Sequence, residues 1–321
     1  MRIVLCYPIE ARHLQQIQAA APGHEVIDAG QERIAAELLA ADIFCGHAKV
    51  PVPWAEVVRR GRLKWIQSSA AGLDHCLTPE VIASEIQVSS ASGLFADQVA
   101  EQTLALLCGV LRGLPTFFRA AQKKEFIRRP TRDLHGATVG IVGLGGNGRR
   151  LAEVLKPFRT RIIATDYFPF QKPPEVDALW SADQLPRLLA ESDIVILCAP
   201  LNAATEGLIG KAEFATMKKG AVFINVARGQ IVQESELIAA LESGHVAAAG
   251  VDVTEVEPLP VDSKLWDLPN VIITPHVGAQ SHRRADDTTD LVADNLRRYL
   301  AGERVRNLVD KKLGFPARSP D

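Results

Sequence analysis

The feature that most constrains this chain is an alternation of short apolar, β-branched runs with segments of helical periodicity along nearly all of its length. Strands that alternate with helices favour a parallel sheet whose faces are covered by helices. The chain has 321 residues, which is more than one hydrophobic core commonly accommodates. We therefore expect an α/β protein with two doubly wound, parallel-sheet domains.

The apolar runs fall into two series. The first third predicts a small doubly wound sheet with helices at Ala11–Ala20 and Glu32–Leu39 and strands at Ile3–Cys6, Glu25–Asp28, Asp42–Gly46, Leu63–Ser68 and Ile86–Ser89. The second series predicts strands at Thr138–Val142, Arg161–Thr165, Asp193–Ala199, Ala221–Val226, Val246–Val251 and Val271–Thr274. Six strands in this rhythm are typical of a Rossmann-type sheet. Its helices are expected at Arg149–Lys156, Ala182–Ala190, Lys211–Met217, Glu234–Glu242 and Ser281–Leu300.

A different pattern separates the two series. Residues from Asp97 to Arg112 are apolar on nearly every side, which predicts a helix that is buried all round and wedged between two domains. A basic and aromatic arm from Leu114 to His135 follows it. At the other end of the chain, the Gly- and Pro-containing tail Lys311–Asp321 is expected to be loosely held.

Charge and cysteine usage exclude several functional classes. The net charge is −2, so no overall field favours nucleic acid or an acidic membrane. The basic stretch from Lys123 to Arg132 is interrupted by Glu125, and we interpret it as a solvated face. The five cysteines are single, without a C-x-x-C pair that would suggest a metal site, and such thiols are typical of a reducing compartment such as the cytoplasm. No apolar run approaches the length needed to span a bilayer.

A glycine-rich segment predicts a dinucleotide site. Gly143-Leu-Gly145-Gly146-Asn147-Gly148 satisfies G-x-G-x-x-G, follows a predicted strand and opens a predicted helix, which is the context that gives this short motif its meaning. Gly143 permits the tight turn, Gly145 lets the pyrophosphate approach the backbone, and Gly148 lets the helix pack on the strand. The phosphates would lie at the helix N-terminus, where free N–H groups favour anions.

An acidic residue follows at the expected distance. Asp166 lies 18 residues after Gly148, at the end of the next predicted strand. A carboxylate there accepts hydrogen bonds from the ribose hydroxyls of the adenosine half and repels a 2′-phosphate. The sequence therefore predicts NAD rather than NADP as the cofactor.

Three ionisable residues each follow a predicted strand of the second series. Arg228 comes after Val222–Val226, Glu257 after the strand that ends at Val251, and His276 after Val271–Thr274. Because ligands bind open α/β sheets at the carboxyl ends of their strands, these side chains should converge there. Arg can fork onto a carboxylate, His can deliver a proton near neutral pH, and Glu can orient the imidazole and favour its protonated form. These three residue types suit the reduction of a 2-keto acid.

The motifs around these residues resemble those of the D-isomer-specific 2-hydroxyacid dehydrogenase family, which includes glyoxylate/hydroxypyruvate reductases and phosphoglycerate dehydrogenases. The similar stretches are Gln67–His75, Asn225–Gly229, Gly250–Val253 with Glu257–Pro260, and Leu265–His276. The resemblance runs from Arg2 to about Leu308. It implies Arg228 as substrate anchor, His276 as acid/base and Glu257 as the partner of His276.

The resemblance also implies a division of labour. A flavodoxin-like substrate domain would comprise residues 1–98 and 287–321, and a Rossmann-type NAD-binding domain residues 99–286. In the first, the Ala70-Ala71-Gly72 loop would bind the substrate carboxylate through backbone N–H groups. In the second, further cofactor contacts are expected at Cys198, Pro200, Thr205, Val226, Ala227, Asp252 and Gly278. Asn147 departs from the large aliphatic residue common in the family just before the third glycine.

Three other interpretations stay open at this point. A dinucleotide-sensing regulator of the same fold would bind NADH without turnover. A formate dehydrogenase-like enzyme would carry Gln where Glu257 stands, so the carboxylate argues against it. A structural domain without a ligand would make every motif a coincidence. The sequence leaves the particular acid undefined, although family analogy favours glyoxylate or hydroxypyruvate. Phe117, Phe118, Phe126 and Ile127 on the arm predict a symmetric dimer.

Overall fold

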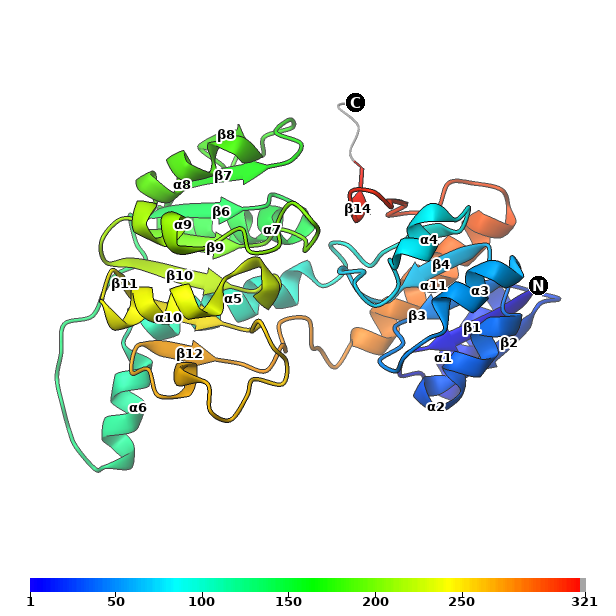
Figure 1. The fold of residues 1–321 in the computed structure, drawn as a ribbon, viewed down its shortest axis with the longest axis horizontal. Helices are drawn as coiled ribbons and strands as arrows, with labels where there is room; N and C mark the ends of the chain where they lie inside the picture. The colour runs from blue at the N-terminus through cyan, green and yellow to red at the C-terminus, as the bar shows by residue number, and fades with distance from the viewer. Residues whose placement is uncertain (318–321) are drawn as a thin grey trace. The chain divides into compact units, whose positions relative to one another are not determined.

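The structure is a computed structural model that describes residues 1–317, and it contains two compact α/β units (Figure 1). Unit 1 comprises Met1–Leu94 and the described chain from Ser281 onward, and unit 2 comprises Phe95–Gln280. The chain thus leaves unit 1 just before a long helix and returns to it just before another. The boundaries expected from the family resemblance, after residues 98 and 286, fall a few residues inside those two helices.

Unit 1 is built on a five-stranded parallel sheet with strand order β2-β1-β3-β4-β5. Its strands are β1 Arg2–Cys6, β2 Glu25–Asp28, β3 Ile43–Gly46, β4 Trp65–Ser68 and β5 Gln87–Ser89. Its helices are α1 Ala11–Ala20, α2 Gly30–Glu37, α3 Trp54–Arg60, α4 Pro79–Ala83 and α11 Arg284–Leu300. The sequence predicted all five strands to within two residues. This strand order is that of flavodoxin-like sheets.

Helix α11 completes the core of unit 1 although it lies at the far end of the sequence. Val292 and Leu296 are buried in one cluster with Ile3, Ile17 and Trp65. A buried polar network reinforces this packing, because the Asn295 amide donates to Gln67 Oε1 over 2.6 Å. The N-terminal sheet and the C-terminal helix therefore form one folding unit.

Unit 2 is built on a seven-stranded parallel sheet with strand order β12-β11-β10-β9-β6-β7-β8. The strands are β6 Thr138–Val142, β7 Arg161–Asp166, β8 Ala178–Ser181, β9 Ile194–Leu197, β10 Ala221–Asn225, β11 Val246–Val251 and β12 Val271–Ile273. The helices are α5 Ala96–Leu111, α6 Leu114–Gln122, α7 Gly146–Leu155, α8 Leu185–Glu191, α9 Lys211–Thr216 and α10 Glu234–Glu242. The predicted fold class, two doubly wound parallel sheets, is confirmed.

Three expectations need correction. Helix α5 is not buried all round, because Asp97, Glu101 and Ala105 form an exposed stripe at four-residue spacing; it packs on β10, β11 and β12 within unit 2. The edge strand β8 was missed. The tail is held as far as it is described, since β13 Val309–Asp310 pairs with β14 Phe315–Pro316, and the remainder, 318–321, lies outside the described residues.

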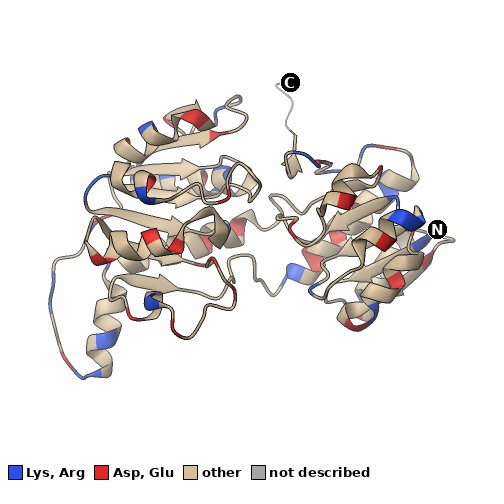
Figure 2. Cartoon of the chain, in the orientation of Figure 1, with Lys and Arg blue, Asp and Glu red and all other residues tan. Residues whose placement is uncertain are grey.

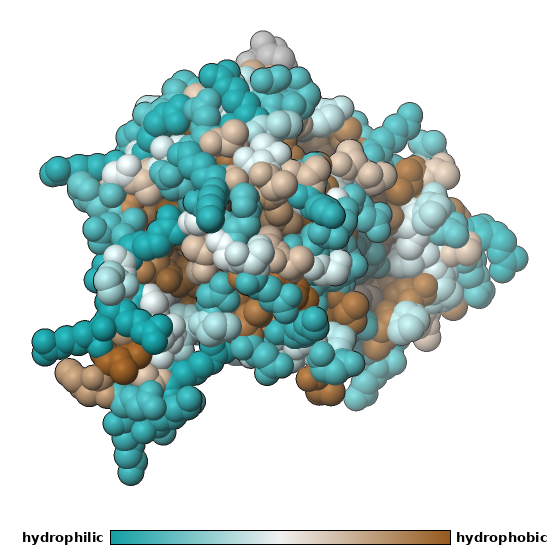
Figure 3. Space-filling model, turned by 60° about the vertical axis from the view of Figure 1, so that its left-hand side comes forward, coloured by the Kyte–Doolittle hydropathy of each residue, from teal (hydrophilic) through white to brown (hydrophobic). Residues whose placement is uncertain are grey.

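Charged side chains lie on helices and loops, whereas the strands of both sheets carry few (Figure 2). The face drawn in Figure 3 is mostly hydrophilic, with scattered hydrophobic patches. The basic stretch from Lys123 to Arg132 is exposed, as predicted. Within residues 1–317 no single helix is long and apolar enough to cross a membrane; the bent pair α5 and α6, at 68°, reaches that length and composition only together.

Candidate active site

The glycine loop occupies the turn between β6 and α7, and its geometry requires glycine. Gly143 has φ +95°, and a Cβ on it would lie 2.7 Å from the backbone of Ala199. A Cβ on Gly148 would lie 2.2 Å from the carbonyl oxygen of Gly143. Helix α7 begins at Gly146 with Gly145 as its N-cap, so its first free N–H groups face the carboxyl edge of the sheet. Asn147 lies in the first turn of this helix.

Asp166 is the last residue of the neighbouring strand β7, at the place where a ribose acceptor is needed. Its Oδ2 accepts a hydrogen bond from Leu144 N over 2.6 Å, and Oδ1 accepts one from Phe168 N over 2.8 Å. One carboxylate thus ties the glycine loop to the segment after β7. A carboxylate has about four lone-pair directions, so both oxygens keep capacity for a ligand.

The residues predicted to act on substrate follow three adjacent strands. Arg228 comes after β10, Glu257 after β11 and His276 after β12, and these strands are neighbours in the sheet. The glycine loop follows β6, one strand beyond β9, and Asp166 follows β7. Neighbouring strands are spaced by about 4.8 Å, so the five steps from β12 to β7 span roughly 24 Å. An extended dinucleotide has room along this edge.

The Arg228 loop is fixed by a buried amide. Asn225, the last residue of β10, is 1% exposed; its Oδ1 accepts from Ala227 N and its Nδ2 donates to Arg228 O, each over 3.0 Å. The backbone of Arg228 is extended. The Nη1 group of its side chain donates to Ala227 O over 2.7 Å. Gly229 must be glycine, because a Cβ there would overlap the carbonyl of Thr254 at 1.8 Å.

His276 and Glu257 form a hydrogen-bonded pair, with 2.8 Å between Nδ1 and Oε2. A carboxylate only accepts, so Nδ1 carries the hydrogen and Nε2 is left for a substrate oxygen. Glu257 Oε1 is held by Thr254 N at 3.3 Å. The side chains are 44% and 39% exposed, so solvent screens part of their attraction.

His276 has φ +54°, a left-handed conformation that costs a residue with a Cβ about 1–2 kcal/mol. Strain of this kind persists only where the surroundings determine it. Here His276 N donates to the Asp252 carbonyl over 2.7 Å. The Asp252 carboxylate is buried and turned toward the same loop.

The Ala70-Ala71-Gly72 loop of unit 1 follows β4. Ser68 Oγ accepts from Ala70 N over 3.0 Å and lies 3.1 Å from Ala70 O, and Ala91 N donates to Ala70 O over 2.9 Å. Within residues 1–317, the N–H groups of Ala71 and Gly72 donate to no protein acceptor. The loop therefore offers two adjacent N–H groups to an anion.

The remaining predicted cofactor residues lie along the same carboxyl edge of unit 2. Cys198 and Pro200 follow β9, and Thr205 Oγ1 donates to Pro200 O over 2.6 Å, closing the loop between them. Burial raises the pKa of Cys198 to about 12, so this thiol stays neutral. Val226 and Ala227 precede Arg228, and Gly278 follows His276. The sequence predicted no role for Ser68 or Asn225, although both lie in stretches that resemble the family, because their hydrogen bonds to the loop backbone depend on how each loop folds.

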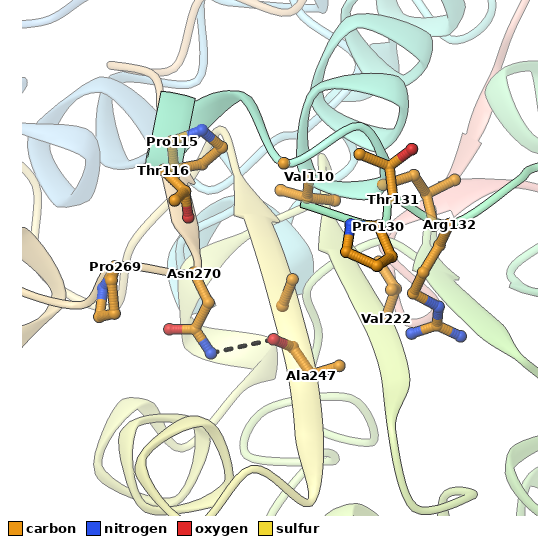
Figure 4. Close-up of a pocket in the computed structure, with 13 residues that line it drawn as sticks. Val110, Pro115, Thr116, Pro130, Thr131, Arg132, Val222, Ala247, Pro269 and Asn270 are labelled. Carbon is orange, nitrogen blue, oxygen red and sulfur yellow. Dashed lines mark hydrogen bonds between the residues drawn. The ribbon is translucent and has the colours of Figure 1, made fainter. Parts of the chain in front are cut away.

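A separate cavity of about 220 Å³ lies at the opposite, amino edge of this sheet (Figure 4). Its walls come from the end of α5, the first turn of α6, the arm residues 130–132, the starts of β10 and β11, and residues 269–270 before β12. The Asn270 amide donates to Ala247 O over 3.0 Å, whereas its Oδ1 is buried without a hydrogen-bond partner in the described chain. No group of three or more His, Cys, Asp or Glu side chains in residues 1–317 is arranged to hold a metal.

A glycine loop with a ribose acid and a His–Glu pair along one carboxyl edge is the arrangement of a nucleotide-dependent oxidoreductase. Residues 104–278 match the family model described as the NAD-binding domain of D-isomer-specific 2-hydroxyacid dehydrogenases. This chain belongs to that family. It is accordingly an enzyme that binds a nicotinamide nucleotide and acts on 2-hydroxy acids.

Related sequences and solved structures agree with this family assignment. The chain is 38% identical over 248 residues to a human protein named glyoxylate reductase/hydroxypyruvate reductase, and the match covers 75% of each chain. It is 33% identical over 263 residues to a Pyrococcus horikoshii protein named glyoxylate reductase, and that match covers 78% of each chain. The structure of a D-isomer-specific 2-hydroxyacid dehydrogenase from Xanthobacter autotrophicus Py2 in complex with NADPH and MES has a TM-score of 0.83 at 31% identity, and the match covers 98% of this chain and 99% of that one.

Proposed function

We propose that this enzyme reduces a small 2-keto acid to the D-2-hydroxy acid, and catalyses the reverse reaction, with Arg228, Glu257 and His276 as its catalytic residues. The observation that carries the proposal is the 2.8 Å pair of His276 and Glu257. These residues follow β12 and β11, and β11 is the neighbour of β10, the strand that precedes Arg228. An imidazole oriented by a carboxylate, with a guanidinium at the same edge of the sheet, matches the needs of a carbonyl that must be held and protonated.

In the proposed reaction, Arg228 binds the substrate carboxylate and polarises the neighbouring carbonyl oxygen. In unit 1, the N–H groups of Ala71 and Gly72 would bind a carboxylate. Nε2 of His276 donates its proton to the carbonyl oxygen as the alcohol forms, and Glu257 stabilises the imidazolium before that transfer. The nicotinamide cofactor, when bound, supplies the hydride. In the reverse direction His276 accepts the hydroxyl proton.

We propose NADH as the preferred cofactor. The support is Asp166, whose charge at the end of β7 opposes a 2′-phosphate. Gly143, Gly145, Gly146, Asn147 and Gly148 would bind the pyrophosphate, and Thr205 would lie beside it. Cys198 and Pro200 would line the adenine half, and Val226, Ala227 and Gly278 the nicotinamide half. The structural relative from Xanthobacter binds NADPH, so the preference needs a direct test.

The cofactor test compares kcat/KM for NADH and NADPH in the wild type, Asp166→Ala and Asp166→Asn. The wild type should prefer NADH by more than tenfold. Both substitutions should reduce that preference, and Asn should do so with the smaller loss of NADH affinity, because its amide oxygen still accepts from the Leu144 or Phe168 N–H. A wild type that prefers NADPH would refute this assignment.

We propose glyoxylate or hydroxypyruvate as substrates, because the Ala70-Ala71-Gly72 loop carries only small side chains and the two relatives cited are named as reductases of such acids. Oxidation of NADH and NADPH in the presence of a panel of 2-keto acids tests the activity. A regulatory sensor of the same fold would bind NADH tightly and turn over none of them.

We further propose a symmetric homodimer, formed through the arm Leu114–Arg132 of unit 2, in the cytoplasm. The support is apolar surface on the arm, where Phe126 is 92% and Phe118 63% exposed, together with the cavity beside it. Five free thiols suit a reducing compartment. Light scattering should report about twice 34.8 kDa for the wild type and a smaller mass for Phe118→Glu/Phe126→Glu. A wild-type monomer at micromolar concentration would exclude the dimer.

A further inference from the structure

We infer that Asp252 is a positioning residue that holds the catalytic loop 274–278 in its strained conformation, and that its carboxylate acts on His276 through the protein. The inference rests on the proposed role of His276. It goes beyond the expectation drawn from the family resemblance, which is that Asp252 lies beside the nicotinamide half of the cofactor.

The first support is the direction in which the carboxylate is used. Asp252 directly follows β11 and is 2% exposed. Its Oδ1 accepts from Thr274 Oγ1 over 2.6 Å and from Val277 N over 3.0 Å, and its Oδ2 accepts from Gly278 N over 2.7 Å. Both oxygens therefore point into the loop that carries His276.

The second support comes from helix α5. Gln102 Nε2 donates to Thr274 Oγ1 over 2.8 Å and lies 3.4 Å from Asp252 Oδ1. With these donors the carboxylate reaches four partners, about the number that a carboxylate accepts. Hydrogen bonds donated by the loop and by Gln102 of α5 therefore balance the buried anion.

The third support is that Asp252 grips both sides of His276. Its backbone carbonyl accepts from His276 N over 2.7 Å, while its carboxylate binds the residue two before His276 and the two residues after it. His276 is left at φ +54° between these contacts. The grip is close, because a Cβ on Gly278 would lie 2.9 Å from Asp252 Oδ2.

This geometry needs a carboxylate. An asparagine at this position would present its NH₂ group to one set of donors, so Gly278 N or Val277 N would lose its acceptor. The loop would then relax toward an ordinary backbone conformation. The imidazole would move with it and lose its 2.8 Å contact with Glu257.

The experiment compares Asp252→Asn with the wild type in three measurements. We expect kcat for keto-acid reduction to fall about 10- to 100-fold, whereas the Kd of NADH, measured by fluorescence, stays within threefold. Hydrogen exchange of the amides of residues 276–278 should accelerate at least tenfold. Nitrogen NMR of the His276 ring should report loss of the Nδ1 hydrogen bond to Glu257.

A matched pair of variants tests the same grip without a change of charge. Thr274→Val removes the hydroxyl donor and should lower kcat and raise loop exchange in the same direction as Asp252→Asn, by a smaller factor. Thr274→Ser keeps the hydroxyl and should behave as the wild type. If Asp252→Asn does not fold, this pair decides the inference.

Two outcomes would overturn the inference. One is a rise of tenfold or more in the Kd of NADH with kcat at saturating NADH unchanged, which would make Asp252 a cofactor contact. The other is unchanged exchange of residues 276–278 in Asp252→Asn. The exchange and NMR measurements need no substrate, so a wild type that reduced no keto acid would refute the proposed function without deciding this one.

Discussion

The two units of this chain share a parallel-sheet architecture, but the loops that follow their strands offer different chemical groups. In unit 1, the loop after β4 offers backbone N–H groups and small side chains, held by the hydroxyl of Ser68. In unit 2, the loops after β10, β11 and β12 offer a guanidinium, a carboxylate and an imidazole. In the function proposed above, unit 1 would recognise an anion through its backbone, whereas unit 2 would perform chemistry through its side chains. Substitutions should therefore have unequal effects in the two units.

The amino edges of the two sheets, by contrast, share one device. Asp42 precedes β3 and accepts from Arg2 N, the first residue of β1, over 2.6 Å. Asp193 precedes β9 and accepts from Thr138 N, the first residue of β6, over 2.8 Å. Each aspartate also pairs with a basic side chain, Arg62 in unit 1 and Lys218 in unit 2. The two units are thus alike at the amino edges of their sheets and differ in the loops that follow their strands.

The largest expected effect is at His276 in unit 2. His276→Asn should lower kcat by roughly 10²–10⁴-fold, the usual contribution of a positioned acid. Asparagine is the sharper substitution because it tolerates the positive φ that alanine does not, so the loop keeps its conformation. Steady-state rates at saturating NADH measure the loss, with NADH binding as the control. A kcat within tenfold of the wild type would assign the acid to another residue.

The next effect concerns Arg228. Arg228→Ala should raise KM and lower kcat together, because the guanidinium holds the carboxylate and polarises the carbonyl. Arg228→Lys should recover less than a tenth of the lost kcat/KM, since an ammonium group cannot make the forked contact. Kinetics with the best keto acid of the panel measure both. Full recovery by lysine would mean that only a positive charge is required.

Glu257 should affect the rate less than His276 itself. Glu257→Gln replaces the charged partner 2.8 Å from the His276 ring with a neutral amide, which accepts a weaker hydrogen bond from Nδ1. We expect kcat for keto-acid reduction to fall about tenfold, with the Kd of NADH unchanged. Steady-state rates at saturating NADH measure this, and an unchanged kcat would separate Glu257 from His276.

A substitution in unit 1 should have a smaller effect, confined to binding. Ser68→Ala removes the hydroxyl that holds Ala70, and should raise KM for the keto acid about 3- to 10-fold, the value of one neutral hydrogen bond, with kcat nearly unchanged. Ser84→Ala is the control, because the Ser84 hydroxyl also joins two backbone groups of unit 1, Val81 O and Ile86 N. A kcat loss in Ser68→Ala as large as that of His276→Asn would abolish the contrast between the units.

The smallest effect tests the shared amino edge. Burial raises the pKa of Asp42, but hydrogen bonds from Arg2 N and Arg62 lower it by more, so the pKa lies below its usual value. Burial likewise raises the pKa of Asp193, and Lys218 and Thr138 N outweigh it. A depressed folded-state pKa contributes stability above the unfolded value near 4, which is lost as the pH falls through the folded pKa.

Asp42→Asn and Asp193→Asn should therefore each lower the free energy of unfolding by about 1 kcal/mol at pH 7, after allowance for solvent screening. The difference from the wild type should shrink as the pH falls below the unfolded value near 4 and through the folded-state pKa of each carboxylate. Urea denaturation at pH 7 and at a series of lower pH values measures this. A loss in one unit only would show that the two aspartates are not equivalent.

The sequence predicted most of the fold because buried parallel strands consist of apolar, β-branched runs that are easy to recognise. It missed β8, Ala178–Ser181, since this edge strand is short, half-buried and contains no β-branched residue. The site was predicted where a motif names a residue and its place after a strand, as for Arg228 and His276. The grip of Asp252 on residues 274–278 could not be predicted, because it depends on how two loops approach each other and on the φ of His276.

The return of α11 to unit 1 has a consequence for synthesis of the chain. Strands β1 to β5 leave the ribosome first, yet the apolar face around Ile17 and Trp65 is covered by Val292 and Leu296. Residues 95–280 are made in between, which takes roughly 10–40 s at 5–20 residues per second. Unit 2 is complete when those residues have emerged, whereas the N-terminal third must wait with part of its core uncovered. In a chain truncated after Gln280, unit 2 should therefore resist protease while unit 1 is still cleaved.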